Sequence, residues 1–115
     1  MSVEKRWQVR IEHILEAIRK IQHYVTGLTE DTFADQSMAV DAVIRNFQVI
    51  GEAVRHVPDL VQARYPEVPW SLMQGMRHVL VHDYYAVKLD VVWRTIQQSL
   101  PPLLEPLQNI LRENP

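Results

Sequence analysis

The sequence contains no cysteine, which excludes disulfide bonds and any metal or iron–sulfur centre held by thiolates. Only three of its 115 residues are glycine, and no Asn-Gly or Asp-Gly pair marks a tight hairpin. The alternation of apolar and polar residues that is typical of a half-buried strand is also absent. These absences argue against a disulfide-stabilised or β-sheet protein and favour a helical one.

The sequence also lacks long hydrophobic runs and an excess of positive charge. No apolar run approaches the roughly 20 residues that cross a membrane, and the first residues form no apolar signal core. We therefore expect a cytoplasmic protein with no membrane segment. The formal net charge is −2, which argues against a general nucleic-acid binder with a basic surface. It does not exclude a site that needs positive charge at a single phosphate.

A helical repeat of apolar residues runs along the whole chain, with steps of three and four residues. The predicted helical segments are 4–24, 29–33, 35–57, 59–65, 69–82 and one that begins near residue 88 and is kinked at Pro101-Pro102. No repeat or linker divides the chain, so one domain over residues 1–115 is expected. Its predicted fold is all-α, an antiparallel bundle of four to five helices.

Three positions make this prediction specific. Gly27 is placed to end the first helix in the left-handed conformation that glycine adopts readily. Asp35 is predicted to be the N-cap of the helix over 35–57. Met38 is expected to belong to the buried face of that helix.

The segment from Arg77 to Tyr85 holds the densest group of chemically active side chains. An arginine fork matches phosphate oxygens, a histidine exchanges protons near neutral pH, and a tyrosine offers a hydroxyl. On an ideal helix Arg77 and Tyr84 share a face, whereas Arg77 and His82 lie about 140° apart. These side chains converge only if the helix ends near His82 or if two chains meet. The structural alternative is that Arg77 and His82 cap the end of a helix.

Two further features bear on this segment. His78 and His82 lie one turn apart, but no third ligand is defined, so neither a metal nor another cofactor is expected. Glu52 follows Gly51 in the middle of a predicted helix, where glycine is unfavourable unless it permits close packing. Glu52 either points to solvent or bonds to Arg77 and holds its guanidinium in position.

The spacing Arg77-x4-His82-x-Tyr84 resembles the Arg-x4-His-x-Tyr signature of HEPN ribonucleases. The stretches Arg45–Ala53, Pro69–Arg77 and Asp90–Trp93 are similar to the HepT branch of that superfamily. One position departs mildly, because His78 stands where another polar residue often follows the motif arginine, and this leaves the role of His78 open.

The resemblance implies a HEPN-like homodimer in which two motifs face a common cleft and cut RNA without a metal. Arg77, His82 and Tyr84 would be catalytic, with Glu52 and His78 in support. It also implies a toxin whose cognate nucleotidyltransferase antitoxin adds AMP to Tyr84. Two alternatives stay open: a non-catalytic partner or substrate of a nucleotidyltransferase, and a structural dimerisation bundle.

Overall fold

The computed structural model describes residues 6–78 and 88–115, and every regular element in these ranges is helical. The elements in chain order are α1 (Arg6–Tyr24), α2 (Glu30–Ala34), α3 (Ser37–Arg55), α4 (Asp59–Arg64), α5 (Trp70–Gly75), α6 (Leu89–Arg94), a π-helical turn η4 (Thr95–Ser99), a 3₁₀ turn η5 (Pro101–Leu103) and α7 (Leu104–Glu113). The predicted all-α class is therefore confirmed. No helix within the described ranges is both long enough and apolar enough to cross a bilayer.

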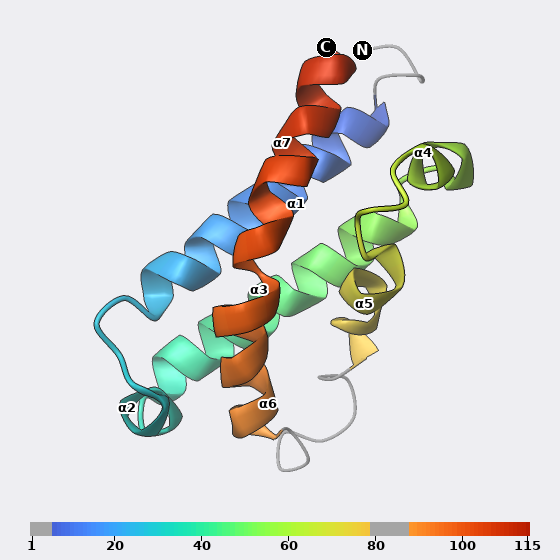
Figure 1. Cartoon of the computed structure of the whole chain (residues 1–115). Helices are drawn as coiled ribbons and strands as arrows, with labels where there is room; N and C mark the ends of the chain where they lie inside the picture. The colour runs from blue at the N-terminus through green and yellow to red at the C-terminus, as the bar shows by residue number, and fades with distance from the viewer. Residues whose placement is uncertain (1–5, 79–87) are drawn as a thin grey trace.

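The two longest helices, α1 and α3, form the centre of the fold (Figure 1). They lie antiparallel, and α7 runs back along α1 at the end of the chain. α6, η4, η5 and α7 follow one another as a single kinked column, as expected from Pro101-Pro102. α5 packs against α3 at the side of the bundle, and this contact brings the turn after α5 against Gly51 of α3.

A single apolar core joins these helices. α1 contributes isoleucines at steps of three and four residues, as the sequence pattern predicts, and α3 contributes a second face with the same spacing. The fully buried side chains include Ile11, Ile14, Ile18 and Ile21 of α1, Val43, Ile50 and Val54 of α3, Met73 of α5, and Leu107 and Ile110 of α7. The core determines how α1 and α3 are rotated about their own axes. It therefore also determines which of their residues face outward.

Two predictions at the start of the second long helix are wrong. Asp35 does not cap α3, because it ends α2, and its amide bonds back to the carbonyl of Asp31. The capping residue nearby is Thr29, which forms a capping box with Thr32 at the start of α2. Met38 is 86% exposed rather than buried. It lies two residues from the buried Val40, which places it on the opposite side of the helix.

The helix predicted over 69–82 is shorter than expected. α5 ends at Gly75, and the amides of Met76 and Arg77 bond to the carbonyls three residues before them. Such bonds tighten a helix end into a 3₁₀ turn. Arg77 therefore lies just beyond the helix, whereas residues 79–82 lie outside the described ranges. The predicted start of the first helix, at residue 4, lies outside the described residues. The other predicted boundaries lie within two residues of the observed ones, and Gly27 has a φ of +79°.

The contact between α3 and the end of α5 depends on Gly51. A Cβ built on Gly51 would lie 2.5 Å from Arg77 Cβ and 2.7 Å from the backbone nitrogen of Arg77. Nonbonded atoms do not approach so closely, so the two backbones meet here only because position 51 has no side chain. The unfavourable effect of glycine within a helix is thus offset by a packing contact that fixes the backbone of Arg77.

We predict that Gly51→Ala destabilises the fold although alanine is the better helix former. Alanine would add about 1 kcal/mol of helix propensity, but overpacking typically costs about 1–3 kcal/mol. Gly75→Ala is the matched control, because a Cβ there meets nothing within 4 Å. Urea denaturation should give a lower midpoint for Gly51→Ala and an unchanged or higher one for Gly75→Ala. A Gly51→Ala midpoint at or above that of the wild type would refute the packing argument.

Candidate functional site

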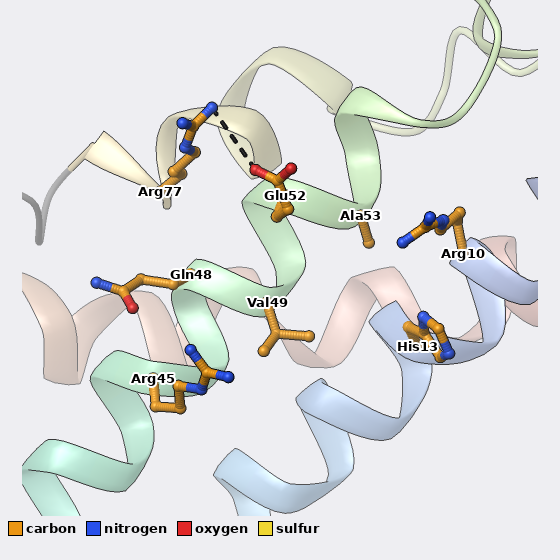
Figure 2. Close-up of a pocket in the computed structure, with 8 residues that line it drawn as sticks. All are labelled: Arg10, His13, Arg45, Gln48, Val49, Glu52, Ala53 and Arg77. Atoms are coloured by element: carbon orange, nitrogen blue, oxygen red, sulfur yellow. Dashed lines mark ion pairs between the residues drawn. The ribbon is translucent and has the colours of Figure 1, made fainter.

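Arg77 and Glu52 share a surface pocket that encloses about 350 Å³. The pocket lies between α1, α3 and the turn after α5 (Figure 2). Arg10 and His13 line it from α1, the turn contributes Arg77, and the residues from α3 are Arg45, Gln48, Val49, Glu52 and Ala53.

The helical repeat explains why these side chains share one face. Arg45, Gln48, Val49 and Glu52 follow one another at steps of three, one and three residues, so they line one side of α3. Arg10 and His13 are three residues apart on α1 and are neighbours for the same reason. The buried apolar residues of both helices point into the core, which leaves these polar faces side by side at the surface.

The carboxylate of Glu52 lies near two arginines and a histidine. Its Oε2 is 3.7 Å from Nη1 of Arg77 and 3.3 Å from Nη1 of Arg55. Its Oε1 is 3.4 Å from Nε2 of His56. The contact with Arg77 that the sequence left open is therefore present, although the Glu52 side chain also remains 46% exposed. Glu52 therefore forms an ion pair with Arg77, whose side chain is 39% exposed.

The neighbours of Glu52 decide its pKa. Desolvation on its own raises the pKa of this carboxyl. The hydrogen bond from His56 and the positive charges of Arg55 and Arg77 act in the opposite direction and together outweigh desolvation. The pKa of Glu52 consequently lies below its ordinary value of 4.5, so the group is ionised at neutral pH and attracts Arg77.

Of the other predicted site residues, only His78 falls within the described ranges. It is exposed, next to Arg77 at the end of the 3₁₀ turn. His82 and Tyr84 lie outside the described residues, and so does Tyr85. Among the residues that the structure does describe, no group of three histidine, aspartate or glutamate side chains is arranged to hold a metal ion.

The sequence argument missed four polar residues of the pocket, namely Arg10, His13, Arg45 and Gln48. Arg45 and Gln48 could have been found, because they lie seven and four residues before Glu52 on the same helical face. Arg10 and His13 carry no comparable signal. Their place beside Glu52 depends on how α1 packs against α3, which periodicity does not reveal.

Comparisons with known proteins agree on a ribonuclease family. The family described as "Ribonuclease HepT-like" matches residues 14–110. The "Probable ribonuclease HepT" of Thermococcus cleftensis is 34% identical over 93 residues, which cover 81% of this chain and 84% of that protein. The "Putative RNase TTE0752" of Caldanaerobacter subterraneus subsp. tengcongensis is 31% identical over 103 residues, covering 90% and 92%.

A third relative is longer. The "Gamma-glutamylcyclotransferase and putative RNase MJ0434" of Methanocaldococcus jannaschii is 33% identical over 111 residues, which cover 96% of this chain. The chain spans half the length of that relative. No solved structure matches the chain significantly.

We predict that Glu52→Gln lowers stability at neutral pH and has little effect in acid. A carboxyl whose pKa is lowered by folding stabilises the fold above its unfolded pKa, and this contribution disappears as the pH falls through the folded value. The urea midpoints of wild type and variant should therefore differ at neutral pH and converge near about pH 3.

Glu16→Gln is the control for this prediction, because among the described residues Glu16 forms one ion pair, with Lys20 at 3.2 Å. Its effect at neutral pH should be smaller than that of Glu52→Gln, as expected for an exposed pair. Equal stability of wild type and Glu52→Gln at neutral pH would show that the contacts of Glu52 with Arg55, His56 and Arg77 do not stabilise the fold.

Proposed function

This chain belongs to the HepT-like ribonuclease family, and we propose on that basis that it is a toxin-type endoribonuclease that needs no metal ion. In this proposal one domain over residues 1–115 carries the activity, and Arg77, His82 and Tyr84 form the active site. The observation that carries the proposal is the position of Arg77. Nη1 of its guanidinium lies 3.7 Å from Oε2 of Glu52, and Arg77 borders an open pocket with two further arginines.

The chemistry requires three roles. The 2′-hydroxyl of RNA attacks the adjacent phosphorus, a base takes the hydroxyl proton, and an acid donates a proton to the departing 5′-oxygen. His82 would fill one of the last two roles, and His82 of a second copy in a homodimer would fill the other. Arg77 would stabilise the negative charge that builds on the phosphorane, where electrostatic stabilisation is largest. The products are a 2′,3′-cyclic phosphate and a 5′-hydroxyl.

Glu52 acts in this scheme as a positioning residue. It does not touch the RNA, and its effect passes through Arg77, whose planar fork must meet the phosphate at a defined angle. Removing the carboxylate should therefore slow the chemical step while leaving the fork charged. His78, exposed beside Arg77, would have a supporting role on the side that faces RNA.

The partner in this proposal is a cognate nucleotidyltransferase antitoxin that transfers AMP to the hydroxyl of Tyr84. Transfer forms a phosphodiester bond between the tyrosine oxygen and the α-phosphorus of ATP and releases pyrophosphate. An AMP group beside Arg77 would occupy the phosphate site and add negative charge that repels RNA. Both effects would silence the nuclease without unfolding it.

We predict that the purified protein cleaves RNA in the presence of EDTA and leaves 2′,3′-cyclic phosphate ends. Arg77→Ala and His82→Ala should each reduce the single-turnover rate by about 100-fold or more. His23→Ala is the matched control, because His23 is exposed at the end of α1 and does not line the pocket. It should cleave like the wild type.

Loss of cleavage in EDTA that zinc or magnesium restores would contradict the metal-free mechanism. A protein that never cleaves RNA but is modified by the nucleotidyltransferase would be a non-catalytic partner of that enzyme instead.

A further prediction separates Tyr84 from its neighbour Tyr85. Coexpression with the cognate nucleotidyltransferase should add AMP mass to the wild type and to Tyr85→Phe, but not to Tyr84→Phe. Phenylalanine keeps the ring and loses only the hydroxyl, so a folding defect is not expected to confuse the result. Intact-protein and peptide mass spectrometry measure the outcome. AMP mass on Tyr84→Phe, or a modified peptide that places the group on Tyr85, would show that the assignment is wrong.

A further inference from the structure

The pocket that contains Arg77 continues along α1 and α3 beyond the Arg77–Glu52 pair. Arg10 and His13 face it from α1, and Arg45 and Gln48 face it from α3 (Figure 2). None of these four residues belongs to the motif that would perform the reaction. They form a second part of the same pocket, next to the proposed catalytic arginine.

The charges of this part of the pocket are unbalanced. Among the residues that the structure describes, three arginines line the pocket, and Glu52, the only carboxylate in this lining, already contacts Arg55, His56 and Arg77. Within residues 6–78 and 88–115, Arg10 and Arg45 make no ion pair and no side-chain hydrogen bond. Positive charges around one pocket repel one another, so a bound anion would stabilise the arrangement. The cluster is a local exception in a chain whose net charge is −2.

The identity of the cations favours a phosphate. All three are arginines, whose planar guanidinium presents paired donors that match phosphate oxygens. Val49 and Ala53 lie between the polar side chains as a small apolar surface, against which the carbon atoms of a sugar can pack. The volume of 350 Å³ lies within the range of about 300–1,000 Å³ that holds small molecules, so it admits more than one phosphate group.

We infer that Arg10 and Arg45, with His13 and Gln48, bind a second phosphate of the RNA strand, next to the one that Arg77 contacts. This inference rests on the proposed ribonuclease function, because it assigns the bound anion to the substrate of that reaction. The subsite binds the sugar–phosphate backbone and touches no base edge, so it adds affinity and register without sequence preference. It also explains how an acidic protein holds RNA, since the positive charge is concentrated where the strand passes.

The test measures binding of a single-stranded RNA oligonucleotide that carries 2′-O-methyl groups and therefore has no nucleophile for cleavage. Fluorescence anisotropy at several salt concentrations gives Kd and its salt dependence. For the double variant Arg10→Gln/Arg45→Gln we expect Kd to rise about tenfold. The slope of the logarithm of the association constant against the logarithm of the salt concentration should become shallower by about 0.7. This is the value for one phosphate of a single strand. Arg10→Lys/Arg45→Lys keeps the charge and loses the guanidinium forks. Its Kd should therefore lie between that of the wild type and that of the glutamine variant.

The matched control is Arg19→Gln/Arg94→Gln, which removes the same charge from exposed positions on α1 and α6 that do not line the pocket. Its Kd should stay within about twofold of the wild-type value, since exposed charges distant from a ligand contribute little in salt. If the pocket and control variants weaken binding equally, the effect comes from overall charge, and the subsite does not exist.

Two other outcomes would also overturn the inference. If the pocket variant keeps its affinity for RNA but loses binding to the nucleotidyltransferase, the basic cluster is a protein interface. If the wild type cleaves unmodified RNA but the pocket variant binds the probe normally, the inference fails while the proposed function stands. If the wild type neither binds nor cleaves RNA, the proposed function fails, and the subsite fails with it.

Discussion

The backbone contact between Gly51 and Arg77 is the constraint on which the rest of the site depends. Only a residue without a side chain lets α3 approach the turn after α5 so closely. The contact fixes the backbone of Arg77, and the next residue of α3, Glu52, then lies within reach of its guanidinium. Gly51 therefore sets how closely the backbone of α3 approaches the backbone of Arg77. Glu52, the next residue, places a carboxylate beside the guanidinium of Arg77.

The electrostatic arrangement follows from this packing. Glu52 is close to Arg77, Arg55 and His56, so its negative charge is largely balanced by neighbouring side chains of the protein. Arg10 and Arg45, on the same pocket, have no such partner among the described residues. A chain with more acidic than basic residues thereby presents a cationic pocket. Net charge describes the whole surface and says little about one site.

The sequence was sufficient for the helical class and most helix boundaries, because steps of three and four residues depend on local geometry alone. It failed at Asp35 and Met38, where Thr29 caps the preceding turn and α3 begins two residues later than expected. It also overextended α5, because the 3₁₀ bonds at Met76 and Arg77 arise where the chain packs against Gly51. Local hydrogen bonds decided the end of α2, and the packing of α5 on α3 decided the end of α5. The sequence suggested a contact of Glu52 with Arg77 as one of two alternatives. Only the packing of α3 on α5 shows that the Glu52 side chain makes this contact.

The central claim is that Glu52 acts through Arg77, and a double-mutant cycle tests it most directly. Single-turnover cleavage rates would be compared for the wild type, Glu52→Gln, Arg77→Lys and the double variant. Lysine keeps the positive charge but cannot form the oriented fork, so it leaves nothing for Glu52 to align. The account predicts that Glu52→Gln slows the wild type and has almost no further effect on Arg77→Lys. Equal effects in both backgrounds would contradict it, because Glu52 would then act independently of Arg77.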